Sequence, residues 1–301
     1  MEENKNHLNY TTLNNGVKMP LAGLGTYNIQ NLADNIYESI KNGLRLIDTA
    51  QFYKNEKEVG EGINKAIKEN IVERKDLFVL TKLWNTSKHI PEETLINQLK
   101  DLNLDYVDLY LDHWPTQINE VDGKIIKTPM HILWKNMENL VKKGLTKSIG
   151  VSNYNIQSLM NLLSFCEIKP VLNEVEFHPY FHQKELLNFC KNNDIQLLAY
   201  NSLCRGVYTK RAHNKEVNYN LLEENVIVEL AKKYNKTPGQ IALNWAIYKN
   251  VAVIPASGKP YRVKENIESA YFRLSKEDYE KVCGLNIGYR FLPSRIAPNQ
   301  V

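Results

Sequence analysis

The segment LIDTAQFYKNE, residues 46–56, starts as a short apolar run, ends that run at Asp48 and places Tyr53 five residues later. A run of this length is too short for a typical helix and predicts a buried β-strand. In barrels of parallel strands, the polar groups that carry chemistry project from the C-terminal ends of the strands. The fold therefore depends on whether similar runs recur along the chain.

Eight short apolar runs of this kind alternate with longer amphipathic segments. They occupy residues 21–26, 44–49, 77–84, 106–114, 146–153, 171–179, 195–201 and 251–257. The segments between them carry helix signals, such as Pro91 in a first turn, Thr237 as an N-cap and Gly144 after a last turn. Because strand and helix alternate eight times, the strands are expected to pair in parallel. We therefore predict an α/β fold, a (β/α)8 TIM barrel.

An open, doubly wound parallel sheet is the alternative to the barrel. Such a sheet usually carries a G-x-G-x-x-G turn after its first strand, whereas GLGTYN (residues 23–28) lacks the third glycine. The pair Asn15-Gly16 predicts an N-terminal β-hairpin with a two-residue turn. Two long connections, residues 115–127 and 203–222, are expected as loops at the C-terminal face of the barrel. No linker interrupts the series, so residues 1–301 are expected to form one domain.

The composition is typical of a globular protein, with 43% hydrophobic and 24% charged residues. The 38 basic and 34 acidic residues nearly balance, without a basic block, so nucleic acid is not an expected partner. No apolar run reaches the roughly 18 residues of a membrane helix, so no membrane association is expected. The four cysteines are widely spaced, without a C-x-x-C pair, and are typical of reduced thiols. We expect a cytoplasmic protein, monomeric or weakly homodimeric, with no metal site.

Ionisable side chains end three consecutive predicted strands: Asp48, Lys82 and His113. Any one of them alone is more often a solvated or structural residue, but three strand ends share one barrel mouth. A cation beside a phenol favours the phenolate, so Lys82, kept charged by Asp48, is expected to lower the pKa of Tyr53. Such a phenol protonates an oxygen that gains negative charge, as a carbonyl oxygen does when hydride attacks its carbon. Because no side chain donates hydride, these residues predict cofactor-dependent carbonyl reduction.

The motifs GLGTY, LIDTAQFY, LTKLW, LDHWP, SIGVSN and VIPAS lie in the order and spacing of the aldo-keto reductases. The chain resembles that family from about Val17 to Phe291. The resemblance implies a barrel that binds a nicotinamide dinucleotide in extended form. It implies that Tyr53 is the general acid, that Lys82 and Asp48 tune it, and that His113 orients the carbonyl of a small-molecule substrate. The implied reaction is the reversible reduction of aldehydes, aldoses such as xylose, or ketones.

The resemblance also implies which residues hold the cofactor. Ser152 and Asn153 match the pair that bonds the nicotinamide carboxamide, and Tyr200 matches the tyrosine on which the ring stacks. The stretch IPASGKPYRVKEN, residues 254–266, matches the segment that meets the 2′-phosphate, so NADPH is expected, with NADH as second choice. The complete implied set is Gly25, Thr26, Tyr27, Asp48, Ser152, Asn153, Glu174, Tyr200, Asn201, Leu203, Ser257, Lys259, Arg262, Glu265 and Asn266.

Two residues depart from the family pattern. Ala256 stands where many members carry lysine, and the cation lies three residues later at Lys259, which leaves dual use of NADH open. Glu174 stands where glutamine usually contacts the carboxamide. An ionised carboxylate accepts hydrogen bonds but does not donate them, and its charge is expected to favour the cationic, oxidised ring.

Aromatic residues at or just past strand ends, Tyr27, Trp84 and Trp114, are expected to line the substrate pocket together with His113. In the family, specificity follows the long loops and the tail, which here begins at about Asn286. Two other functions stay open. One is a Schiff-base aldolase with Lys82 as nucleophile, which requires a lowered lysine pKa. The other is a non-enzymatic NADP(H)-sensing or structural protein with the same fold.

Overall fold

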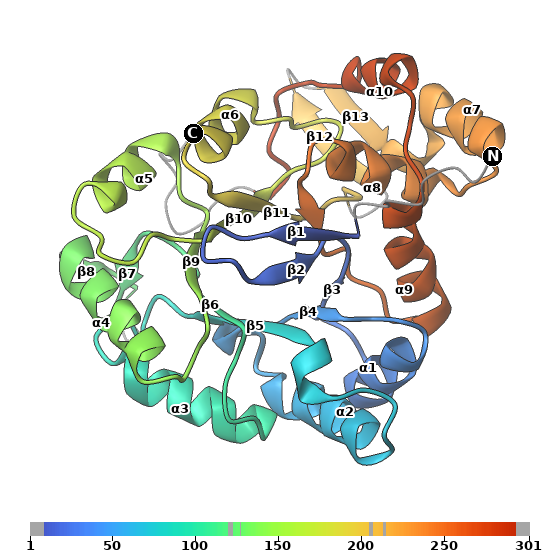
Figure 1. Cartoon of the computed structure of the whole chain (residues 1–301). Coiled ribbons are helices and arrows are strands. Elements are labelled where there is room, and N and C mark those ends of the chain that lie inside the picture. The colour runs from blue at the N-terminus through green and yellow to red at the C-terminus, as the bar shows by residue number, and fades with distance from the viewer. Residues whose placement is uncertain (1–8, 120–122, 127, 205–206, 213–214, 293–301) are drawn as a thin grey trace.

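The predicted barrel is confirmed: eight parallel strands form one sheet in which neighbours follow the order of the sequence (Figure 1). This computed structural model describes residues 9–119, 123–126, 128–204, 207–212 and 215–292. A parallel bridge between Ala22 and Val253 joins the first and last strands. The strands are β3 (Leu24–Gly25), β4 (Leu46–Asp48), β5 (Phe78–Leu83), β6 (Leu109–Asp112), β9 (Ile149–Ser152), β10 (Leu172–Glu176), β11 (Gln196–Tyr200) and β14 (Ala252–Val253).

Helices surround the strands, as Figure 1 shows. They are α1 (Leu32–Lys41), α2 (Glu56–Lys68), α3 (Pro91–Leu102), α4 (Met130–Lys142), α5 (Ile156–Leu163), α6 (Lys184–Asn192), α7 (Asn225–Tyr234), α8 (Pro238–Tyr248), α9 (Pro260–Ile267) and α10 (Lys276–Cys283). Short 3-10 helices are η1 (Gln51–Tyr53), η2 (Arg74–Asp76), η3 (Leu221–Glu223) and η4 (Glu268–Tyr271). The boundary signals behave as predicted: Pro91 begins α3, and Thr237 caps α8 by accepting a hydrogen bond from Gln240 N at 3.3 Å.

The N-terminal hairpin is present, but its predicted two-residue turn is wrong. Strand β1 (Tyr10–Thr12) pairs with β2 (Lys18–Pro20), and Leu13 N bonds Val17 O at 2.9 Å across a three-residue loop. Gly16 has φ +85°, the left-handed conformation that ends such a loop. It is therefore the third residue of a three-residue loop and not the second residue of a two-residue turn. The hairpin lies across the strand ring in Figure 1, and Thr11 Oγ1 bonds Gln196 Oε1 at 3.0 Å, at the N-terminal end of β11.

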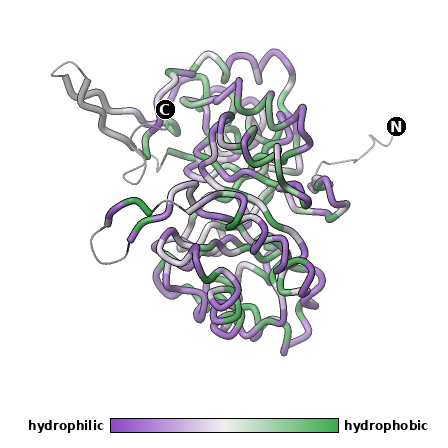
Figure 2. The backbone as a smooth tube through the Cα atoms, turned by 90° about the vertical axis from the view of Figure 1, so that its left-hand side faces the viewer, coloured by the Kyte–Doolittle hydropathy of each residue, from purple (hydrophilic) through white to green (hydrophobic). Residues whose placement is uncertain are grey.

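The two long connections follow β6 and β11, so both begin at the C-terminal ends of strands, and Figure 2 shows backbone that projects from one side of the barrel. Each contains a small antiparallel sheet that the sequence did not predict. One pairs β7 (Gln117–Ile118) with β8 (Ile125–Ile126), and the other pairs β12 (Val207–Ala212) with β13 (Lys215–Asn220). Parts of both predicted loops lie outside the described residues, as does the end of the predicted tail: residues 120–122, 127, 205–206, 213–214 and 293–301.

The expected single domain of residues 1–301 stays a prediction, because both ends of the chain lie outside the described part. Among the described residues, no helix combines the length and the apolar character that crossing a bilayer requires.

Candidate active site

Strand alternation directs Lys82 into the barrel. The neighbouring Thr81 points outward, because its Oγ1 donates to Glu56 Oε1 on α2 at 3.0 Å and accepts from Gln98 Nε2 on α3 at 2.8 Å. Successive side chains of a strand face opposite sides, so Lys82 faces the interior. Its side chain is fully buried. A buried ammonium needs a counter-charge, and the site places two carboxyl groups beside it.

Asp48 and Glu174 are the two carboxyl neighbours of Lys82. The Lys82 ammonium forms a short hydrogen bond to Asp48 Oδ1, at the end of β4, and lies 3.3 Å from Glu174 Oε2 on β10. It also donates to Thr49 O at 3.2 Å. The fourth neighbour is Tyr53, whose hydroxyl lies 3.4 Å from Lys82 Nζ. The structure therefore brings three of the four predicted catalytic groups together around one ammonium.

The charges of this cluster hold Lys82 protonated. Burial by itself lowers the pKa of Lys82, but the charge of Asp48, joined by that of Glu174 when Glu174 is ionised, outweighs burial and raises the pKa above its usual value. Burial, and then the charge of Asp48, raise the pKa of Glu174 to about 8, although Lys82 opposes the shift. Glu174 is therefore mostly protonated at neutral pH, which corrects the expectation of an ionised carboxylate there. A protonated carboxyl donates as well as accepts hydrogen bonds.

The expected lowering of the pKa of Tyr53 is wrong for this structure. Burial raises the pKa of Tyr53, and Lys82 lowers it as predicted but by less than burial raises it. The charges of Asp48 and Glu174 add to the increase. Tyr53 is consequently a fully protonated phenol at neutral pH, with the cation that stabilises its phenolate beside it.

His113 lies next to Tyr53. Their rings meet edge to face, with centroids 5.9 Å apart. Burial, followed by the nearby cations Lys82 and Lys88, lowers the pKa of His113 well below 6.5. The imidazole is therefore neutral at pH 7, with one nitrogen that donates and one that accepts.

Aromatic rings surround this pair. The ring of Tyr27 lies 5.0 Å from that of Tyr53, and the ring of Trp84 lies 5.0 Å from that of His113. Phe52 stacks on Trp84 at 4.1 Å and was not predicted, although it stands in the segment that first indicated the site. Trp114 follows His113, but among the described side chains no ring contact joins its indole to this group.

Ser152, Asn153 and Tyr200 form one network beside Glu174. Tyr200 OH donates to Asn153 Oδ1 at 2.8 Å, and Asn153 Nδ2 donates to His113 O at 3.1 Å. Ser152 Oγ donates to the backbone oxygen of Glu174 at 3.0 Å. Asn153 has φ +62°, which a short amide side chain tolerates better than most. The implied nicotinamide residues thus lie in mutual contact and next to His113.

Other implied cofactor residues form hydrogen bonds or packing contacts within the protein itself. Thr26 N bonds Asp48 O at 3.0 Å, and Asn201 Nδ2 donates to Glu176 Oε1 at 2.8 Å. A Cβ added to Gly25 would lie 2.8 Å from Ile254 O, so only glycine allows this approach of the strands. Leu203 packs against the hydrophobic core.

The implied adenosine segment lies at the start of α9. Lys259 and Arg262 are exposed, and Ser257 Oγ accepts from Lys259 N at 3.2 Å. Lys259 is the N-cap residue of α9 and forms no side-chain cap. Pro260 brings no N–H to this helix start, and Arg262 N donates to Lys259 O at 2.9 Å, so the side chains supply most of the available donors. Two cations and a hydroxyl together fit a phosphate group.

Glu265 and Asn266 are less exposed to solvent than Lys259 and Arg262. Glu265 Oε1 accepts from Thr237 Oγ1 at 2.6 Å, and Asn266 is buried. Glu265 therefore braces the start of α8, a structural role that the sequence did not predict.

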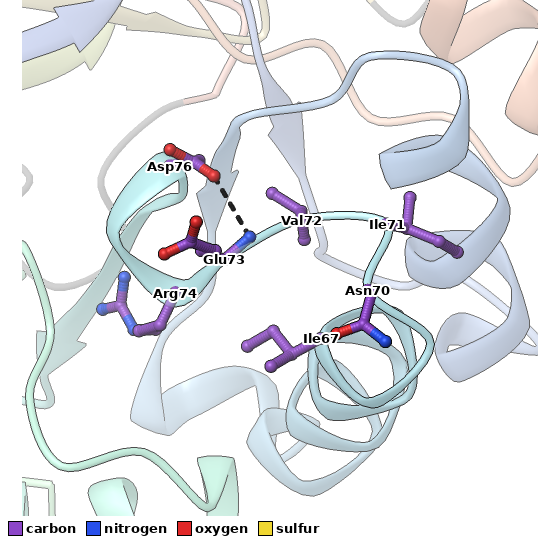
Figure 3. A pocket seen from close by; sticks show the side chains of 7 residues that line it. All are labelled: Ile67, Asn70, Ile71, Val72, Glu73, Arg74 and Asp76. Carbon is purple, nitrogen blue, oxygen red and sulfur yellow. Dashed lines mark hydrogen bonds between the residues drawn. The ribbon is translucent and has the colours of Figure 1, made fainter.

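A cavity of about 420 Å³ lies elsewhere, between the end of α2 and η2 (Figure 3). It is lined by Ile67, Asn70, Ile71, Val72, Glu73, Arg74 and Asp76. Asp76 precedes β5, so the cavity opens at the N-terminal end of the strand, whereas Lys82 lies near the C-terminal end. The cavity therefore has no part in the candidate site. Within the described residues, no group of three or more His, Cys, Asp or Glu side chains could hold a metal ion.

Comparison with known proteins gives a consistent result. A family model described as the aldo/keto reductase family matches residues 19–287. The chain is 40% identical over 301 residues to the NAD(P)H-dependent D-xylose reductase I,II of Candida tropicalis, with 93% of each protein covered. It is 38% identical over 304 residues to the 4-dihydromethyl-trisporate dehydrogenase of Mucor mucedo, with 94% of each covered. The solved aldose reductase of Schistosoma japonicum has a TM-score of 0.87 and 30% identity, with 95% of each chain covered.

Proposed function

The chain belongs to the aldo/keto reductase family, and on this premise we propose that it reduces aldehydes, aldoses or ketones to alcohols with Tyr53 as general acid. It is an NAD(P)H-dependent oxidoreductase. The observation that carries the proposal is the 3.4 Å distance from Tyr53 OH to the buried ammonium of Lys82, with the His113 ring 5.9 Å from the phenol ring.

In the proposed reaction, bound NADPH supplies the hydride, and the side chains of the chain handle the oxygen of the carbonyl. Tyr53 donates its proton to that oxygen as negative charge develops on it. The phenolate that remains is stabilised by Lys82, which the carboxylate of Asp48 keeps positively charged. His113, neutral at pH 7, donates an N–H to the same oxygen and orients it toward Tyr53.

The proposed cofactor contacts divide into two groups. Ser152, Asn153 and Glu174 lie close enough together to meet a carboxamide, and the partly exposed ring of Tyr200 offers a stacking surface. Lys259 and Arg262 with the start of α9 would hold a 2′-phosphate. NADPH is therefore the proposed cofactor, with NADH as the alternative, in agreement with the NAD(P)H-dependent name of the Candida tropicalis relative.

The substrate side of the site favours a compact carbonyl compound. Tyr27, Phe52 and Trp84 present aromatic surface, and Tyr27 is 48% exposed, so its hydroxyl is accessible. A sugar offers C–H faces for such rings and hydroxyls for the polar edges. D-xylose is the proposed test substrate because the Candida tropicalis relative is named a D-xylose reductase.

The Schiff-base alternative receives no support from the site. A nucleophilic lysine must be neutral, whereas the carboxylate of Asp48 raises the pKa of Lys82. Tyr53, Lys82 and His113 are neighbours, as carbonyl reduction requires. A purely cofactor-sensing role would therefore be favoured only if the protein binds NADPH without reducing a carbonyl compound. These functions are separated by the experiment that follows.

NADPH oxidation at 340 nm is measured with D-xylose and with benzaldehyde for the parent protein and Tyr53→Phe. The parent is expected to turn over, and the variant to lose about 10²- to 10⁴-fold in kcat while it keeps its NADPH Kd. Tyr106→Phe, at the N-terminal side of β6, is the matched control and should keep full activity. A parent that binds NADPH but reduces neither aldehyde would contradict the proposal and favour the sensing role.

A further inference from the structure

A second buried ion pair lies one residue from His113. Asp112, the last residue of β6, and Lys88, in the loop after β5, are both almost completely buried. Lys88 Nζ lies 2.8 Å from Asp112 Oδ2, and Tyr154 OH donates to the same oxygen at 2.7 Å. None of the three belongs to the proposed proton-transfer or cofactor groups.

Lys88 also holds the backbone on the other side of His113. Its ammonium forms a short hydrogen bond to the carbonyl oxygen of Trp114. One side chain thus binds the residue before His113 and the residue after it. The backbone of His113 itself is held by two other hydrogen bonds, from His113 N to Leu83 O at 3.2 Å and from Asn153 Nδ2 to His113 O at 3.1 Å. Lys88 adds a restraint at the next residue, Trp114.

The same loop is tied to the helical turn that carries Tyr53. Gln51, two residues before Tyr53 in η1, donates from Nε2 to Ser87 Oγ at 2.8 Å. The amide N of Trp84 donates to Gln51 Oε1, also at 2.8 Å. Residues 84–88, which we name the bridging loop, therefore contact the Tyr53 segment at one end and the His113 segment at the other.

Stability alone is a weak reason for a buried ion pair at this position. Removing two charges from water is costly, and apolar side chains of similar volume often stabilise a protein as well or better. What an ion pair adds is fixed geometry: the Lys88 ammonium directs its protons at two defined oxygens, Asp112 Oδ2 and Trp114 O. This cluster binds the residues on both sides of His113, and its loop contacts Gln51 in the turn that carries Tyr53, so the geometry that it fixes is that of these two segments.

We propose that Lys88 and Asp112 are positioning residues that, through the bridging loop, set the separation of Tyr53 and His113. Both side chains must reach one carbonyl oxygen at hydrogen-bonding distance, and an error of about 1 Å in such an arrangement reduces the rate roughly 100-fold. The inference rests on the proposed reductase function, since it assigns a role in that reaction.

The test uses Lys88→Met combined with Asp112→Asn. This double variant removes both charges, so no unpaired charge is buried, and the amide still accepts from Tyr154. Gln51→Met is an independent variant that leaves the ion pair intact and disconnects the bridging loop from the Tyr53 segment. The matched control is Arg74→Met with Asp108→Asn, which removes a 2.8 Å ion pair at the N-terminal end of the strands.

Single-turnover oxidation of bound NADPH by saturating benzaldehyde is followed by stopped flow. For the double variant and for Gln51→Met, the rate is expected to fall at least tenfold, with unchanged amplitude and unchanged NADPH Kd. The control should keep the parental rate. Loss of structure would instead reduce the amplitude, which counts the competent molecules.

Parental rates in both test variants, or an equal decrease in the control, would overturn the positioning role. A decrease in amplitude at parental rate would do the same, because it would assign the cluster to folding alone. Failure of the parent itself to oxidise NADPH would contradict the proposed function, and that outcome is recognised before any variant is compared.

Discussion

The Nζ atom of Lys82 on β5 lies 3.3 Å from Oε2 of Glu174 on β10, although two strands separate β5 from β10 in the sheet. The contact crosses the interior of the barrel. It gives the ammonium a second buried carboxyl besides Asp48, and it places a titrating group with a pKa of about 8 beside the proposed proton donor.

Glu174→Gln is expected to stabilise the protein increasingly as the pH rises. The folded-state pKa of Glu174, about 8, exceeds its usual 4.5, so between these values the folded state binds more protons than the unfolded state. The stability that protonated Glu174 contributes to the parent is fully present below pH 4.5 and is lost as the pH rises from there through 8. Urea denaturation gives the free energy of unfolding of both proteins at pH 5 and pH 9. The difference between variant and parent should shift in favour of the variant by at least about 1.4 kcal/mol from pH 5 to pH 9, the equivalent of one pKa unit. A difference that does not change with pH would contradict the assigned pKa.

The same substitution should remove a pH dependence of cofactor selection. In the parent, Glu174 becomes ionised above pH 8, and its charge then favours the cationic ring of NADP⁺ over NADPH. The ratio of the Kd of NADPH to the Kd of NADP⁺, measured by fluorescence titration, is expected to rise between pH 6 and pH 9 in the parent and to stay level in Glu174→Gln. Parallel curves for the two proteins would show that Glu174 does not face the nicotinamide.

Lys82→Met is expected to destabilise the protein by about 3–5 kcal/mol at neutral pH, because two buried carboxyls lose their cation. The deficit should grow toward pH 9, where Glu174 ionises beside Lys82 in the parent but has no cation beside it in the variant. Lys147→Met is the control: its partner Asp108 is buried, but the Lys147 side chain is 42% exposed, so a loss below about 1 kcal/mol is expected. Denaturation curves at both pH values measure these effects, and equal losses for the two variants would contradict the argument.

Arg262→Ala is expected to weaken NADPH binding at least tenfold and to leave NADH binding within twofold, because only NADPH carries the 2′-phosphate. Lys264→Ala removes an equal charge from the same helix and should affect neither cofactor. Lys259→Ala is expected to behave as Arg262→Ala does, with a smaller effect, since an ammonium lacks the bidentate geometry of a guanidinium. Equal weakening of NADPH and NADH by Arg262→Ala would place the phosphate elsewhere.

Some contacts of the site could be predicted from the sequence and others could not, for physical reasons. Asp48 and Lys82 could be identified as partners because each ends an apolar run, and adjacent parallel strands bring such ends together. The contact of Lys82 with Glu174 could not be predicted in this way, because the position of a strand end does not determine which side chains meet across the interior of the barrel. The pKa of Tyr53 was wrong in direction, since burial was not known and exceeded the effect of the cation.

The periodicity of the sequence by itself determined the barrel, the order of its strands and the end at which the polar groups gather, because alternation and short-range signals are local properties. The tertiary structure alone decided which of those groups touch, how deeply they are buried and therefore how they are charged. It also decided that the bridging loop connects Gln51 to Asp112, since hydrogen bonds between residues distant in sequence depend on the packing of the whole chain.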